Sequence, residues 1–399
     1  MFVASYLRWR DVVEGEPYRL LFPFGAALGM AGVMLWPALV YGWIEVYPGI
    51  LHARIMVQGF VFSFMAGFLL SALPHMLEVR GVSLGGTMLM MAFIAAIAGL
   101  HLYGNMVWAD GLFAVAVAVL AVLGLRRWPE RRDLPPPGFA LAALGLASGF
   151  TGAAVLSVSA VGDIPPWWVV FAKLLLYHGM ILFPVLGVGA YLLPRMVGIS
   201  NRHLIAPKSS RPSRAWLARA GFMLMCGVVL IGSFALEASG QIRWAYGLRT
   251  VTVMACLLHE VPLFRSPGIR GSIPWALALS IISIFCGLAV IAIWPGRMMT
   301  YAHLLFISGY GLLILNIAAR VMLGHSGYTD LIYARSRAAN WITGLVLLAM
   351  ATRVSADLIP SMMWSHYAYA ALTWGVVTLI WLAVYGPLVA IKPKPEEGA

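Results

Sequence analysis

The sequence contains few charged residues. Only 11% of its 399 residues are Asp, Glu, Lys or Arg, whereas 61% are hydrophobic. A water-soluble domain carries about 25% charged residues. This composition therefore excludes an ordinary aqueous surface, and it predicts a protein that lies almost entirely within lipid.

The sequence also lacks the patterns of a disulfide framework and of a nucleotide site. Its three cysteines, Cys226, Cys256 and Cys286, lie within apolar segments and form no CxxC pair, so we interpret them as buried packing residues. No Gly-rich phosphate loop or Walker motif occurs, which excludes ATP hydrolysis by this chain. Residues 1–19 have no apolar core followed by a cleavage site, so we expect insertion through the first spanning helix.

The basic residues follow the connections between apolar segments. A net charge of +12 could indicate nucleic acid, but the basic residues form no single run or face. Most of the 27 lysines and arginines lie in alternate connections, and the positive-inside rule then places both termini in the cytoplasm. We predict one integral membrane domain, 1–399, in the inner (cytoplasmic) membrane, with lipids and no nucleic acid as partners.

Apolar segments of membrane length recur along the whole chain. A bilayer core requires about 20 apolar residues per helix. This length predicts an all-α polytopic bundle, with no convincing internal repeat. The expected helices cover 18–44, 52–74, 84–107, 111–125, 138–160, 167–194, 215–238, 242–263, 273–294, 299–321, 340–359 and 366–391, about twelve transmembrane helices in total.

Five of the nine histidines fall in the outer halves of these helices. Ionisable groups within a bilayer are costly and are functional candidates by default, and neutral imidazole is a ligand for haem iron and copper. A membrane histidine is nevertheless more often a packed or interfacial residue, and equal depth does not bring residues together in the membrane plane. Both interpretations stay open for His52, His101, His178, His303 and His366.

The helix that begins near His52 shows a patterned face. His52, Met56 and Gly59 lie at i, i+4 and i+7, and they therefore share one side of the helix. Small residues such as Gly59 and Gly67 either let a flat macrocycle approach or serve close packing against a neighbouring helix. Later in the chain, His325 in a Gly-His-Ser-Gly turn could be a ligand, a headgroup contact or a turn residue.

Four stretches of sequence together resemble the NnrS family of haem- and copper-containing membrane proteins linked to nitric oxide stress. The stretches read EPYRLLFP at 16–23, HARIM at 52–56, GFLLSALP at 67–74 and RVMLGHSG at 320–327. The last two of these close the helices that begin near His52 and His303.

The resemblance implies a haem, expected to be b-type, together with copper and a role in nitrosative stress. Twelve helices with histidines on the second, sixth and tenth are also similar to subunit I of haem–copper oxidases. In that subunit, the histidines of helices 2 and 10 bind a low-spin haem, and a histidine of helix 6 binds copper. The corresponding residues are His52, His303 and His178.

The chain also departs from these patterns. No His-His pair occurs in helix 7, the family histidine of helix 9 is missing from 277–280, and the family arginine of helix 3 is replaced near Asn105. The metal set is therefore expected to differ. The predicted cofactor-binding residues are His52, His303, Arg54, Met56 and Lys173, where Arg54 and Lys173 would contact haem propionates; the predicted metal ligands are His52, His303, His178, His101 and His325.

Three functional interpretations remain open at this point. The first is a haem protein that acts on or senses nitric oxide or another small diatomic, including a redox enzyme such as a nitric oxide reductase. The second is a haem-bearing electron-transfer or assembly subunit with an electron donor. The third is a secondary transporter of a metal or small anion, which should show two symmetric halves with broken helices. The sequence indicates no catalytic residue, and deep carboxylates for proton pumping are few: Glu237, Glu260 and Asp357.

Overall fold

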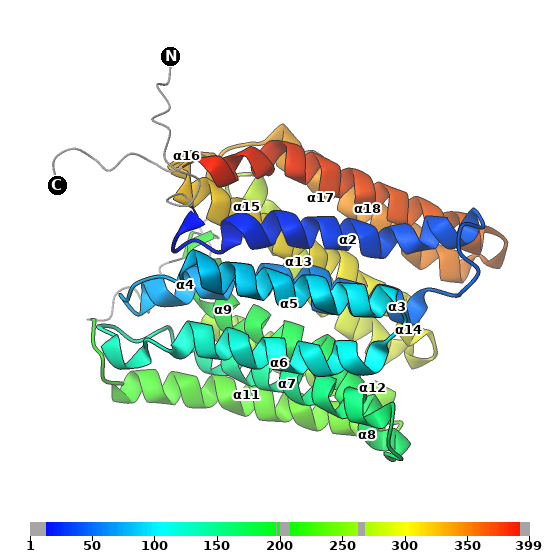
Figure 1. The fold of residues 1–399 in the computed structure, drawn as a ribbon, viewed down its shortest axis with the longest axis horizontal. Coiled ribbons are helices and arrows are strands. Elements are labelled where there is room, and N and C mark those ends of the chain that lie inside the picture. Colours follow the sequence, from blue (N-terminus) through cyan, green and yellow to red (C-terminus); the bar gives the residue numbers. More distant parts are fainter. Residues whose placement is uncertain (1–12, 197, 200–207, 262–267, 392–399) are drawn as a thin grey trace.

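The computed structural model describes residues 13–196, 198–199, 208–261 and 268–391, which form an antiparallel bundle of twelve helical rods (Figure 1). Eleven of the described helices are long and apolar enough to cross a membrane, so the predicted polytopic all-α fold is confirmed. The rods are α2 (Tyr18–Val40), α3–η1–α4 (Gly49–Arg54, Ile55–Val61, Phe62–Met76), α5 (Leu84–Leu102), α6 (Met106–Leu125), α7 (Phe139–Ser159), α8–η3–α9 (Pro166–Leu174, Leu175–Gly179, Met180–Met196), α11 (Arg214–Ala238), α12 (Ile242–Glu260), α13 (Ser272–Ile293), α14–η6–α15 (Met298–His303, Leu304–Gly311, Leu312–His325), α17 (Arg337–Leu358) and α18 (Met363–Tyr385).

The connection between α5 and α6 differs from the prediction. We expected helices over 84–107 and 111–125, but α5 ends at Leu102. Gly104 follows with a φ of +84°, a backbone conformation that glycine adopts without steric cost. The side chain of Asn105 then accepts a hydrogen bond from the Trp108 amide, and this N-cap begins a 20-residue α6 at Met106.

The twelve rods fall into three sets of four, a repeat that the sequence analysis did not detect. In each set the second rod contains a π-helical segment: η1, η3 or η6. The fourth rod of each set packs against the first rod of the next, α6 on α7 and α12 on α13, and α18 packs against α2. The last set is thereby joined to the first, and the bundle closes.

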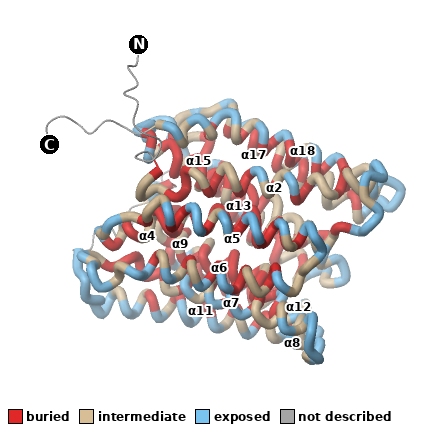
Figure 2. Tube along the Cα trace, viewed as in Figure 1, coloured by how far each residue is buried: buried red, intermediate tan, exposed pale blue. Residues whose placement is uncertain are grey.

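The three rods with π-helical segments lie at the centre of the bundle (Figure 2). Between 67% and 78% of their apolar windows is buried, against 50% or less for the other candidate spans. These rods carry His52, His178 and His303, each within three residues of the start of its π-helical segment. π-helical turns are frequently found at functional sites. The recurrence therefore supports these three histidines as candidate functional residues.

Both ends of the described bundle meet at one end of the molecule, here called the proximal end. Arg19, at the start of α2, is 1% exposed. Its Nη1 donates to the carbonyl oxygens of Leu388, Val389 and Ile391 at 3.1, 2.7 and 2.8 Å, and it pairs with Glu16. The opposite, distal end contains α3 and α14 (Figure 1).

Candidate functional site

His52 and His303 lie at the distal end and are held in the same way. His52 Nδ1 is 2.9 Å from the Gly32 carbonyl oxygen, and His303 Nδ1 is 2.8 Å from the Met299 carbonyl oxygen. A carbonyl can only accept a hydrogen bond, so each Nδ1 carries the proton and each Nε2 keeps a lone pair. Neither Nε2 has a hydrogen-bond partner among the described residues. Metal-ligating histidines are commonly oriented in this manner.

Arg353, on α17, belongs to a polar group at the same distal end. Arg353 Nη1 is 2.9 Å from Asp357 Oδ2, and its guanidinium lies 4.2 Å from the centre of the Tyr367 ring. The Tyr367 hydroxyl donates to Asp357 at 2.6 Å. A half-buried cation with its counter-charge therefore lies at the distal end, and the sequence analysis gave Arg353 no role.

Trp36 connects this group to the histidines. Its ring is 4.8 Å from that of Tyr367 and 5.7 Å from that of His52. Met56 packs on the same part of α2, since a Cβ added to Gly32 would lie 3.1 Å from Met56 Sδ. Met56 thus supports the backbone whose carbonyl orients His52.

The two glycines singled out in the sequence serve helix packing. A Cβ on Gly59 would lie 3.3 Å from Leu28 Cδ1, and one on Gly67 would lie 2.9 Å from Phe22 Cε1. Both contacts are with side chains of α2, so these glycines let α2 approach the second rod closely. The structure favours this packing interpretation over approach to a macrocycle.

Arg54 lies in a buried polar network and does not extend towards the membrane surface. Its Nη2 is 2.8 Å from Asp110 Oδ2, and its Nη1 donates to the Tyr177 hydroxyl at 2.7 Å. Gln58 Nε2 donates to Asp110 Oδ1 at 2.6 Å, and Gln58 Oε1 is 2.8 Å from His101 Nε2. Because the amide oxygen only accepts, His101 carries its proton on Nε2, and its buried Nδ1 has no partner among the described residues.

Asp110 was missed in the sequence because the expected helix began one residue after it. Its carboxylate is the only negative charge on this network among the hydrogen bonds and ion pairs of the described residues. A buried arginine without such a partner would be very unfavourable. Sequence position alone gave no sign that α6 would bring Asp110 against the second rod.

His178 has a separate environment on the sixth rod. Its ring lies 5.5 Å from that of Phe306 and 6.4 Å from that of Tyr246, and its buried Nδ1 has no partner in the described part of the chain. Nearby, Arg249 pairs with Glu237 at 2.6 Å and lies over the Tyr246 ring at 4.4 Å. Lys173, one turn away on α8, is exposed.

His325 lies at the other end of the molecule. It is 22 residues beyond His303 on one continuous rod, a separation of about 33 Å at 1.5 Å per residue, so the two cannot share an ion. His325 Nδ1 is 3.1 Å from Glu16 Oε1. Burial raises the pKa of Glu16, but hydrogen bonds from His325 and Arg19 and their charges outweigh it and lower the pKa to about 2.

The metal ligands predicted from the sequence do not gather into one polydentate site. In the described ranges, no three His, Cys, Asp or Glu side chains come close enough together to hold a metal ion. A haem needs fewer protein ligands, because the porphyrin supplies four of the six around iron. Two imidazoles such as His52 and His303, each with an unpartnered Nε2 among the described residues, would suffice to hold a haem, while His101, His178 and His325 have other surroundings.

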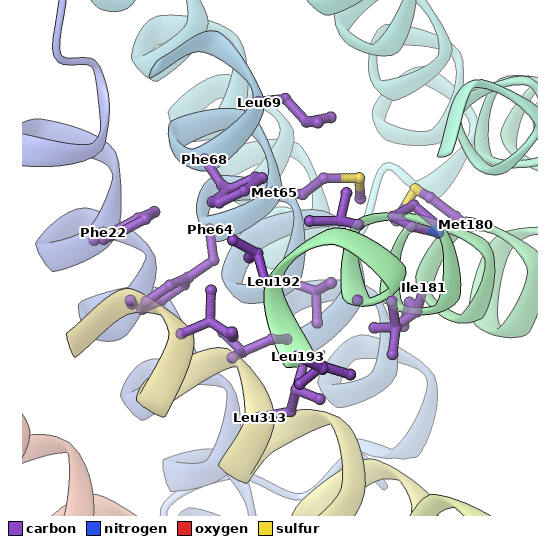
Figure 3. A pocket seen from close by; sticks show the side chains of 18 residues that line it. Phe22, Phe64, Met65, Phe68, Leu69, Met180, Ile181, Leu192, Leu193 and Leu313 are labelled. Carbon is purple, nitrogen blue, oxygen red and sulfur yellow. The ribbon is translucent and has the colours of Figure 1, made fainter. Parts of the chain in front are cut away.

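An apolar cavity of about 110 Å³ lies where α2, α4, α9 and α15 meet (Figure 3). Phe64, Met65, Met180, Leu193 and Leu313 are among the side chains that line it. Its lining is almost entirely apolar, and such a space suits small uncharged molecules better than ions. The cavity thus lies among the central rods that carry the three histidines.

No curated protein matches the chain. A family model described as NnrS protein matches residues 13–392, a range that includes the four sequence stretches and both distal histidines. This multi-pass membrane protein belongs to the NnrS family.

Proposed function

We propose that this protein is a haem-binding integral membrane metalloprotein that acts on or responds to nitric oxide. The observation that carries the proposal is the pair of distal imidazoles, each with Nδ1 tied to a backbone carbonyl and Nε2 unpartnered within the described residues. Membership in the NnrS family supports the link to nitric oxide. The haem would be b-type, because the sequence has no CxxCH attachment motif.

His52 and His303 would hold the iron through their Nε2 atoms. The Gly32 and Met299 carbonyls would keep both rings in the correct tautomer and orientation. Arg353 is better placed than Arg54 to balance an anionic haem edge, because the rings of Tyr367 and Trp36 connect it to His52. Arg54 is already engaged by Asp110 and Tyr177, and Lys173 is exposed. When bound, the haem would supply binding of diatomic gases and one-electron chemistry.

The residues of the chain would exclude water and admit an uncharged gas. The cavity among the central rods is lined by apolar side chains, and an apolar gas partitions into such a space more readily than an ion does. His178 is the proposed ligand of a second metal, copper, because its buried Nδ1 has no partner among the described residues. No group of three His, Cys, Asp or Glu side chains surrounds it in the described ranges, so His178 would be the main protein ligand there.

An optical spectrum of the purified protein, with metal analysis, tests the proposal. We expect a low-spin haem spectrum that His52→Ala or His303→Ala abolishes or converts. His366→Ala is the matched control, because His366 is also a histidine at the distal end but lies on α18, outside the central rods that carry His52 and His303. Unaltered spectra and full haem content in both His52→Ala and His303→Ala would refute the ligand assignment.

Addition of nitric oxide separates the remaining interpretations. A spectral change on addition, with consumption of the gas by the reduced protein, supports a redox enzyme; binding without consumption supports a sensor. A haem spectrum indifferent to nitric oxide indicates an electron-transfer subunit supplied by a donor. A transporter would show no haem, and the three sets of four rods do not match the two-fold repeats typical of transporters.

A further inference from the structure

Arg320, near the proximal end of α15, is a cation without a carboxylate partner in the described part of the chain. The other arginines of the rods that are not exposed each pair with a carboxylate: Arg19, Arg54, Arg219, Arg249 and Arg353. Arg320 is half-buried, and its Nε instead donates to Met196 Sδ on α9 at 2.9 Å. A thioether sulfur is a weak and uncharged acceptor, so it does not balance the charge.

The contact between Arg320 and Met196 lies at the proximal end of the apolar cavity (Figure 3). Leu193 on α9 and Ala318 on α15 line the cavity. Met196 follows Leu193 by three residues and Arg320 follows Ala318 by two, which is less than one helical turn in each case. The contact therefore joins α9 and α15 just beyond the apolar lining, and an unbalanced positive charge lies next to an apolar space.

The cavity is long as well as apolar. On α9 its lining runs from Met180 to Leu193, a separation of 13 residues or about 20 Å. With its open part, the space between the lining side chains is about 730 Å³, which is within the usual range of ligand pockets. One leaflet contributes half of the hydrocarbon core of about 30 Å, so the cavity is long enough to receive an acyl chain.

We propose that this site binds one anionic phospholipid, with its phosphate at Arg320 and one acyl chain in the cavity. Basic pockets between membrane helices on the cytoplasmic side recognise anionic headgroups, and the positive-inside rule places the proximal end in the cytoplasm. Arg195, which is exposed and precedes Met196 on α9, adds a second positive charge. A free phosphate would balance Arg320 but would leave the cavity without an occupant, and a zwitterionic lipid would bring a cation of its own.

Extension towards the membrane surface accounts for Arg320 less well. Long cationic side chains near helix ends often lay their apolar stem along the protein and keep the charge in the headgroup layer, and the exposed Arg195 fits that pattern. Arg320 is turned towards Met196 on a neighbouring central rod. An uncompensated charge between two membrane helices is costly, so the site favours an anionic ligand.

A lipid in the cavity is compatible with the proposed function but does not depend on it. An acyl chain leaves the space apolar, and a small uncharged gas can move along it as it does in the membrane itself. The phosphate would lie at the proximal end, far from His52 and His303, which lie at the distal end of their rods.

The headgroup part of the proposal can be tested by native mass spectrometry of the full-length protein. The protein is delipidated and then offered equal amounts of phosphatidylglycerol and phosphatidylcholine with identical acyl chains. We expect the wild type to retain one phosphatidylglycerol with at least a tenfold preference, and Arg320→Gln to remove that preference. The control Arg337→Gln, at an exposed position on α17, should match the wild type.

The acyl-chain part is tested by filling the cavity. Val188 lines it and is half-buried, so Val188→Phe should lower the retention of phosphatidylglycerol at least tenfold. The control Val115→Phe, at a position on α6 that is 48% exposed, should leave retention unchanged. Inorganic phosphate should not displace the lipid from the wild type, because it cannot occupy the apolar space.

The thermal midpoint and the haem spectrum of each variant show whether it is folded. They also separate this site from the proposed haem site, because the lipid-site variants should keep the wild-type haem spectrum. Equal retention of the two lipids by the wild type, or an unchanged preference in Arg320→Gln, would overturn the proposal. So would displacement of the lipid by inorganic phosphate, or wild-type retention in Val188→Phe, which would place the lipid outside the cavity.

Discussion

The distal and proximal ends of the molecule use histidine in opposite ways. At the distal end, His52 and His303 are held only through Nδ1 by backbone carbonyls, and their Nε2 atoms are available. At the proximal end, His325 is engaged by the carboxylate of Glu16 and stacks near Tyr18, with ring centres 5.1 Å apart. The two distal histidines contact neutral backbone acceptors and lie on the central rods, whereas His325 contacts a carboxylate from the other end of the described chain and joins segments that are distant in sequence.

The proximal group joins two of the sequence stretches that suggested the family. Glu16 and Arg19 belong to the first stretch, and His325 belongs to the last, more than 300 residues later. Ser326 Oγ also donates to the Leu388 carbonyl at 3.1 Å. These residues therefore connect the beginning of α2, the end of α15 and the segment after α18, a role that needs no cofactor.

The largest expected effect comes from replacing a distal histidine by alanine, with the same replacement of the proximal His325 as the comparison. His52→Ala and His303→Ala should each lower the haem content about tenfold or more, because one of the two proposed haem ligands would be lost. His325→Ala should leave the haem absorbance per protein within error of the wild type. Loss of haem in a folded His325→Ala variant would contradict the distinction between the ends.

Arg19→Met should be the most destabilising change at the proximal end. It removes three hydrogen bonds to carbonyls and leaves Glu16 without its arginine; breaking a buried ion pair costs about 3–5 kcal/mol. Thermal unfolding in detergent measures the loss. Arg80→Met is the control, because Arg80 has a 74% exposed side chain and a 3.8 Å contact with Glu14, and such exposed pairs contribute about 1 kcal/mol or less.

Acid should weaken the proximal end before it affects the distal pair. The pKa of Glu16 falls from 4.5 to about 2 on folding, so the stabilisation is complete above 4.5 and is lost as the pH falls from 4.5 towards 2. At 1.36 kcal/mol per pH unit it is on the order of 3 kcal/mol. Unfolding followed between pH 6 and pH 3 should show a shallower pH dependence for Glu16→Gln; an unchanged slope would exclude Glu16 as the source.

The smallest effect should come from Gly32→Ala. The added Cβ would lie 3.0 Å from Ile55 Cγ2 and 3.1 Å from Met56 Sδ, so these side chains must shift by a few tenths of an ångström while the Gly32 carbonyl still holds His52. We expect retained haem with a small shift in its absorption bands. Gly99→Ala, which meets no atom within 4 Å, should give an unshifted spectrum.

The spanning helices were predictable because their signal is local. About twenty consecutive apolar residues identify a bilayer helix whatever its neighbours are, and eleven of the twelve expected segments have starts within three residues of the observed ones. The shared depth of His52 and His303 followed from the same reasoning, since each lies near the start of a rod that enters from the distal side. The turn at Gly104 was missed because apolar residues continue on both sides of it.

Which groups meet across the bundle was decided by the tertiary structure. The pairing of Arg54 with Asp110, the contact of Trp36 with Tyr367 at the distal end and the contact of His325 with Glu16 all join rods that are distant in sequence. The three sets of four rods and the contact of Cys256 on α12 with Met223 on α11 were likewise decided by tertiary packing. Hydropathy determines how deep a residue lies, but its neighbours in the membrane plane depend on how the rods pack and rotate, and that information is spread over the whole chain.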